Sequence, residues 1–175
     1  MIGSVLFASR AENQKSRGFW NWPGRPDSVR RSFSVLAPPE IGISRLGVFS
    51  LFAGLDTEAI SEIARSAEDK WVKAGTMVIR QGQIGKEIYL LETGSVAIYT
   101  EKNDACRLIA EIDAPTVFGE MAVMNPERIR TSNVEAITDL KLLVIPISEF
   151  VLFLRRFVAL RNNLLGMVSE RPPAQ

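Results

Sequence analysis

The sequence has no histidine and only one cysteine, Cys106, among its 175 residues. A disulfide needs two cysteines, and protein zinc sites draw most of their ligands from cysteine and histidine. One chain therefore cannot assemble a disulfide framework or a Cys/His zinc centre, and we expect neither a metal nor a cofactor. The scarcity of cysteine favours a reducing compartment, so the expected location is cytoplasmic. Cys106 is expected to be a small side chain on an edge strand.

Long apolar runs are also missing from the chain. No run approaches the about 20 apolar residues that a membrane-spanning helix needs. The composition is nevertheless 46% hydrophobic, which suits one domain with a sizeable core and possible tails. We therefore expect a soluble protein with little room for a second domain.

Net charge is only +1, but it is distributed unevenly. Residues 1–34 carry six Arg or Lys side chains against Glu12 and Asp27, which gives +4 and leaves −3 for the rest. Such a start is typical of a targeting segment or an arm for an acidic partner, and also of a disordered tail or a misplaced start. We expect residues 1–40 to be a basic, disordered arm and linker, residues 41–170 a domain, and residues 171–175 a tail.

The middle of the chain changes from helical to strand periodicity near Lys70. Before it, Asp56 precedes apolar residues at helical spacing and is a suitable helix start. After it, short apolar runs alternate with turn residues about every ten residues, as in a β-sandwich or roll. The expected strands include Trp71–Val72, Met77–Ile79, Ile88–Leu91, Val96–Tyr99, Leu108–Ile112 and Leu140–Ile145.

The last part of the chain predicts one long helix that ends near Ser169. Its apolar stripe comprises Phe150, Phe153, Leu154, Phe157, Leu160, Leu164, Leu165 and Met167. A stripe of this width packs a helix on another layer of the domain. Pairing with a second subunit is the alternative, and the two can coexist.

Residues 117–136 have the features of a small anion site. Gly119 permits a tight turn, and the next residues, Glu120 to Met124, are suited to one helical turn whose first N–H groups favour negative charge. A turn at Asn125-Pro126-Glu127 then brings back two arginines, Arg128 and Arg130. Arginine binds phosphate through two parallel hydrogen bonds. In most proteins, however, a carboxylate and an arginine at this separation form a salt bridge or remain solvated.

The order FGE-M-A, short loop, R-T-S-x-V-x-A resembles the phosphate-binding cassette of the cyclic nucleotide-binding domain family. The upstream RQGQIGKEIYLLETGSVAIY is similar to the glycine-punctuated strands of that family, and the resemblance covers roughly residues 46–169. It implies an α+β fold, an antiparallel β-roll of jelly-roll type with flanking N-terminal and C-terminal helices. The family often has acidic residues where this chain has Gln83 and Lys86.

The resemblance also implies roles for individual residues. Glu120 matches the glutamate that binds the ribose 2′-hydroxyl, and Arg130 matches the phosphate-binding arginine. Arg130 is favoured over Arg128, so Arg130 should be the buried one. In the family, an Arg-Thr pair such as Arg130 and Thr131 weakly favours cGMP. Both side chains can reach one ligand only if Arg130 lies at the loop end of its strand. Asn133 replaces a more usual Thr or aromatic residue. The expected ligand-binding residues are Gly119, Glu120, Met121, Ala122, Arg130, Thr131 and Ser132.

The resemblance implies a non-enzymatic sensor for cAMP or cGMP, with no catalytic residues, whose C-terminal helix movement signals to an effector protein or within a homodimer. The alternative is a degenerate domain of the same fold that acts as an interaction module without nucleotide. A cupin-like enzyme is disfavoured, because such enzymes hold metal with histidines. A DNA-reading helix-turn-helix is not expected either, since few residues follow the last helix.

Overall fold

The computed structural model describes residues 42–102 and 105–170. The predicted arm and the tail therefore lie outside the described residues, and the proposed domain boundaries remain predictions. Among the described residues, no helix has the length and apolarity to cross a bilayer. The same part of the chain has no group of three metal-ligating side chains.

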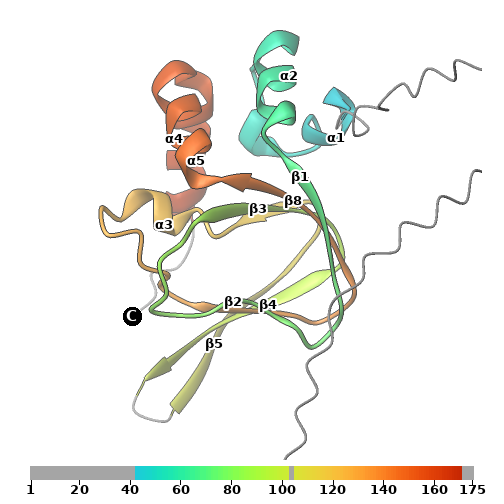
Figure 1. Ribbon diagram of the computed structural model, residues 1–175. Helices are drawn as coiled ribbons and strands as arrows, with labels where there is room; N and C mark the ends of the chain where they lie inside the picture. Colours follow the sequence, from blue (N-terminus) through green and yellow to red (C-terminus); the bar gives the residue numbers. More distant parts are fainter. Residues whose placement is uncertain (1–41, 103–104, 171–175) are drawn as a thin grey trace, which may run out of the picture. The chain divides into compact units, whose positions relative to one another are not determined.

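Two antiparallel four-stranded sheets form the β-roll predicted for this domain (Figure 1). The first sheet has the order β1-β8-β3-β6, with bounds β1 Glu68–Val72, β3 Glu87–Thr93, β6 Thr116–Phe118 and β8 Leu140–Pro146. The second has the order β2-β7-β4-β5, with bounds β2 Met77–Ile79, β4 Ser95–Lys102, β5 Ala105–Asp113 and β7 Asn133–Ala136. Cys106 lies exposed on β5, an edge strand, as predicted.

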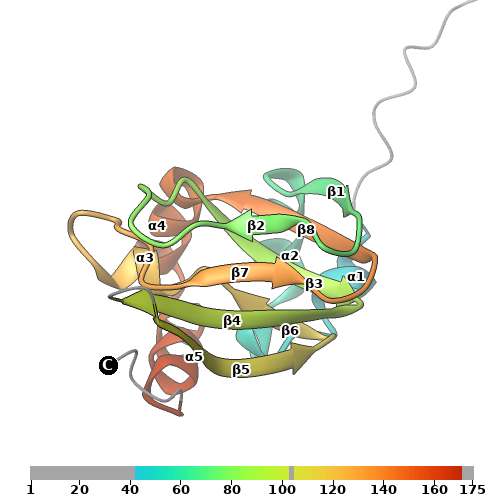
Figure 2. The same cartoon turned by 90° about the horizontal axis from the view of Figure 1, so that it is seen from below.

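Helices cover the outer face of the first sheet (Figure 1). Their bounds are α1 Ile43–Leu46, η1 Ser50–Phe52, α2 Thr57–Arg65, α3 Met121–Met124, α4 Ile147–Arg156 and α5 Val158–Glu170. The predicted start of α2 is confirmed, because the Asp56 carboxylate caps it by accepting a hydrogen bond from the Ala59 N–H at 2.8 Å. The domain therefore has three layers, namely helices, first sheet and second sheet (Figure 1), and Figure 2 shows the second sheet in front.

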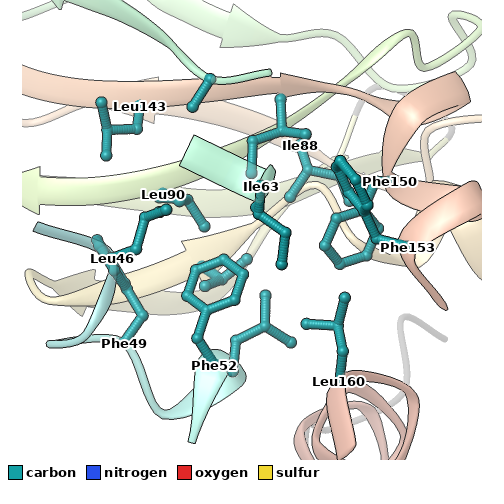
Figure 3. Packing of buried hydrophobic residues seen from close by; sticks show 14 of the residues in the cluster. Leu46, Phe49, Phe52, Ile63, Ile88, Leu90, Leu143, Phe150, Phe153 and Leu160 are labelled. Carbon is teal, nitrogen blue, oxygen red and sulfur yellow. The ribbon is translucent and has the colours of Figure 1, made fainter. Parts of the chain in front are cut away.

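Both faces of β3 are buried, which explains its continuous apolar run. Ile88 and Leu90 face the helices and join the cluster drawn in Figure 3, which includes Phe52 of η1 and Phe150 of α4. The alternate residues of β3, Tyr89 among them, belong to a second cluster between the two sheets. The first sheet is thus the central layer of the domain.

The single C-terminal helix predicted from the sequence is wrong, because the helix is interrupted at Phe157. This residue has φ −104° and ψ 103°, so the chain turns between α4 and α5. The turn lets α5 contact η1, where Leu160 and Leu164 are buried. Leu165, counted in the predicted stripe, is 46% exposed. The helix α5 reaches Glu170, the last described residue, so the predicted end near Ser169 stays a prediction.

Candidate functional site

The predicted site lies where two loops pair with each other. The loop between β2 and β3 lies beside the segment from α3 to β7 (Figure 2), and Ile84 forms an isolated antiparallel bridge with Ile129. Gly82 N–H donates to Arg130 O at 2.9 Å, and Arg130 N–H donates to Gln83 O at 2.8 Å. Gly85 N–H donates to Arg128 O at 2.7 Å. These bonds hold the backbone of Arg130 against the loop.

Gly119 provides the turn into the site, as predicted. Its φ of 82° lies in the left-handed region, and α3 follows directly as a single helical turn. The turn after α3 is also confirmed, because Asn125 O accepts from Arg128 N–H at 2.8 Å. The Asn125 side chain accepts from Glu127 N–H at 2.9 Å. These local bonds bring the chain back from α3 towards β7.

Arg130, rather than Arg128, is the buried arginine, which confirms the burial prediction. Arg130 is 7% exposed, whereas Arg128 is exposed and has φ 56°. The Arg130 guanidinium donates from one terminal nitrogen to Gly119 O at 2.7 Å and from the other to Glu87 O at 2.6 Å. It therefore joins the cassette to the start of β3.

The surroundings of this guanidinium are partly apolar and partly negative. Burial lowers the pKa of Arg130, and electrostatic interactions with Tyr89, Glu87 and Glu120 oppose that shift. The Tyr89 ring centroid lies 5.8 Å from the guanidinium carbon, a cation–π distance. The Tyr89 hydroxyl donates to Glu87 Oε2 at 2.5 Å. Burial and this bond raise the pKa of Tyr89. The site therefore keeps a desolvated cation among oriented acceptors.

Six of the seven predicted site residues line one cavity of about 50 Å³, which we call the cassette cavity. They are Gly119, Met121, Ala122, Arg130, Thr131 and Ser132. Arg130 and Thr131 both precede β7, so Arg130 does lie at the loop end that simultaneous access requires. Three further lining residues, Ile79, Ile98 and Val134, come from strands and were not predicted. Strand alternation predicts that the side chains at such positions point inward. It does not predict which cavity they line.

Glu120 is the predicted site residue that does not line this cavity. It is fully buried, and it lines neither this cavity nor the larger one beside it. Both Glu120 and Arg130 are buried, which rules out the alternative of two solvated surface charges. Asn133, the departure from the family pattern, is buried at the start of β7, where its side-chain oxygen accepts from Gln81 N–H at 2.9 Å. Its side chain therefore supports the backbone that follows β2.

Comparison with known proteins gives one family match. The model of the cyclic nucleotide-binding domain matches residues 69–157, just over half of the chain. A cyclic nucleotide-gated potassium channel from Rhizobium etli is 29% identical over 150 residues, which make up 86% of this chain and 37% of the channel. The cyclic AMP receptor protein of Thermus thermophilus is 25% identical over 69% of this chain and 56% of that protein. The chain thus spans well under two thirds of either relative.

Solved structures share the same architecture. The Thermus thermophilus catabolite activator protein aligns with a TM-score of 0.62 at 25% identity, over 69% of this chain and 56% of that one. The regulatory domain of Toxoplasma gondii PKA, crystallised with cAMP, aligns with a TM-score of 0.59 over 63% of this chain and 42% of that one. Its identity of 21% shows the shared fold alone. With the β-roll, its helical layer and the match across residues 69–157, this chain belongs to the cyclic nucleotide-binding domain family.

Proposed function

We propose that this domain is a non-enzymatic sensor that binds cAMP or cGMP in the cassette cavity. The observation that carries the proposal is the convergence of six cassette residues on one cavity, with the buried guanidinium of Arg130 in its wall. The family consists of regulatory and binding domains, and relatives named as a cyclic AMP receptor protein and as cAMP-dependent protein kinase regulatory subunits support the ligand class.

In the proposed complex, Arg130 binds the phosphate of the nucleotide. The guanidinium is desolvated, so a charge-assisted hydrogen bond to an anion is worth more there than at the surface. Glu120 binds the ribose, which requires the cassette to open, because its side chain is fully buried without ligand. Thr131 lies exposed at the cavity and is the residue that would distinguish cGMP from cAMP.

Packing around α3 supports a route for the signal. Ala122 is buried in the same apolar cluster as Phe150 and Phe153 of α4 and Leu160 of α5, and Val123 packs against it. A ligand that moves α3 therefore changes the packing of the C-terminal helices directly. We expect the output to pass from α4 and α5 to an effector protein or a second subunit.

Calorimetry with cAMP and cGMP tests the proposal, with Arg130→Ala and Arg128→Ala as matched variants. Loss of the Arg130 partner should weaken binding by roughly 2 to 5 kcal/mol, because the phosphate is left unpaired in a partly buried site. Arg128→Ala should leave the affinity unchanged, since Arg128 is exposed. Arg130→Lys and thermal melts of each variant separate lost binding from lost folding. If calorimetry detects no heat of binding at nucleotide concentrations up to millimolar, the proposal is rejected.

The second candidate is an interaction module of the same fold that binds no nucleotide. It is favoured by the small cavity, because pockets for drug-sized ligands usually begin at about 300 Å³, and by the engagement of both terminal nitrogens of Arg130 with carbonyls. A melting temperature insensitive to either nucleotide, together with silent calorimetry, would support this candidate. Hydrogen exchange of α4 and α5 that slows or speeds with nucleotide would contradict it.

A further inference from the structure

A second, larger cavity lies between β2, the β2–β3 loop and Tyr89. Its volume is about 260 Å³, and it shares Ile79 and Arg130 with the cassette cavity. Pockets for drug-sized ligands usually begin at about 300 Å³, and one water occupies about 30 Å³ of liquid. The cavity therefore has room for a phosphate-sized group with some water.

The lining of this cavity is cationic. Arg80, Lys86 and Arg130 line it, and Glu87 is the acidic residue among its lining side chains. Arg80 and Lys86 are exposed, and within the described residues neither side chain has a hydrogen-bond or salt-bridge partner. Cations gathered around one cavity repel each other, and an anion between them would relieve that repulsion.

Glu87 carries one negative charge against the three positive charges of this lining. Its Oε2 accepts the hydroxyl of Tyr89 at 2.5 Å. Arg130 donates to the backbone carbonyl of Glu87 rather than to the carboxylate. A guanidinium has further N–H donors beyond the two used here, and it binds oxyanions through parallel hydrogen bonds. The lining therefore keeps an excess of positive charge and spare donors.

We propose that this cavity is a second anion site, which binds a phosphate dianion between Arg80, Lys86 and Arg130. The site is separate from the cassette cavity, because the first two of these residues line only the larger cavity. It is linked to the cassette through Arg130, which lines both. Two anions on one guanidinium repel each other and share its donors, so phosphate and cassette ligand should oppose each other.

Titration with inorganic phosphate at constant ionic strength tests the site. Backbone amide NMR monitors the titration, which starts from a buffer without phosphate. We expect saturable shifts centred on residues 79–87, and an affinity about tenfold weaker in Arg80→Gln/Lys86→Gln, since two charge-assisted contacts are lost. Arg155→Gln/Arg161→Gln removes the same charge from exposed positions on α4 and α5 and should bind like the wild type. Equal affinity in all three proteins, or no saturation in the wild type, would overturn the proposal.

Two sources of the dianion are distinguishable. Free phosphate and 5′-AMP that bind equally well indicate recognition of the phosphate group alone, whereas tighter binding of 5′-AMP indicates a phosphate carried by a nucleotide. Either result supports a phosphate site. If neither free phosphate nor 5′-AMP binds, the proposal is refuted.

Opposition between the two ligands rests on the proposed sensor function. If cyclic nucleotide binds, phosphate should weaken it in the wild type but not in Arg80→Gln/Lys86→Gln; an effect that persists in that variant would count against the link. If cyclic nucleotide does not bind, the sensor proposal fails and the direct phosphate titration still decides the second site.

Discussion

At the scale of single residues, Gly85 shows how closely the β2–β3 loop packs on the cassette. A Cβ placed there would lie 2.8 Å from Ala122 Cβ and 2.8 Å from the guanidinium carbon of Arg130. Gly85 does not have a positive φ, so the position requires space rather than special backbone freedom. Its N–H bond to Arg128 O prevents an easy retreat of the loop.

Gly85→Ala should therefore destabilise the domain by about 1 to 3 kcal/mol, the usual cost of overpacking. It should also weaken nucleotide binding, because Arg130 must shift to admit the methyl group. Gly166→Ala is the control, since a Cβ there meets nothing within 4 Å and lies in α5. That change should raise the free energy of unfolding by about 0.5 to 1 kcal/mol, because alanine has a higher helix propensity than glycine. Urea unfolding measures both effects, and a Gly85→Ala variant as stable as the wild type would contradict the packing argument.

At the scale of elements, the side chain of Asn163 hydrogen-bonds α5 to the N-terminal helical segment. Asn163 Nδ2 donates to Leu51 O at 3.0 Å and to Ala53 O at 2.8 Å, which are carbonyls in and just after η1. These bonds supplement the burial of Leu160 and Leu164. Because the chain turns at Phe157, α5 can adopt this position independently of the direction of α4.

Asn163→Ala should destabilise the domain by about 1 to 2 kcal/mol, because two carbonyls lose their donor. Hydrogen exchange in α5 should become faster, while exchange in α4 stays close to that of the wild type. Asn162→Ala is a matched control in the same helix, and its side chain is exposed. Equal acceleration in both variants would mean that Asn163 does not hold α5 in place.

At the scale of the whole domain, an ion-pair network joins the helical layer to the first sheet. Arg45 of α1 binds Asp69 of β1 and Glu92 of β3, with Arg45 Nε to Glu92 Oε1 at 2.7 Å. Lys141 of β8 lies 3.3 Å from the same carboxylate. Burial acts to raise the pKa of Glu92, but the hydrogen bonds and positive charges of Arg45 and Lys141 together outweigh burial and lower the pKa. The hydrogen bond from Arg45 likewise lowers the pKa of Asp69.

A lowered carboxyl pKa in the folded state stabilises the fold above the ordinary Asp and Glu values, about 4, and the gain is lost as pH falls through the lowered values. Arg45→Gln should therefore cost about 1 to 2 kcal/mol near pH 7, and the difference from wild type should shrink below pH 4. Lys73→Gln removes an exposed pair with Asp139 and should change little at any pH. Urea unfolding from pH 7 to pH 3 gives the comparison, and a constant Arg45→Gln difference would contradict the linkage.

Local features of the sequence determined much of this domain. Asp56 before an amphipathic run predicts the cap of α2, and β2 matches its predicted run, Met77–Ile79. Gly119 and Asn125 predict the two turns of the cassette. These features depend on residues close in sequence, whose capping, turn and alternation preferences act over a few positions. For the same reason the cassette residues could be identified before their cavity was known.

Only the tertiary structure decided which distant segments meet. The break at Phe157 has no local signal, because it arises where α5 packs on η1. The carbonyl partners of Arg130 lie 11 and 43 residues away in sequence, at Gly119 and Glu87. Arg80 and Lys86 reach the same cavity wall as Arg130 only through the pairing of two loops. By itself, the sequence determined the local elements and the cassette, whereas strand order, burial and shared cavities depend on long-range packing, which local periodicity does not encode.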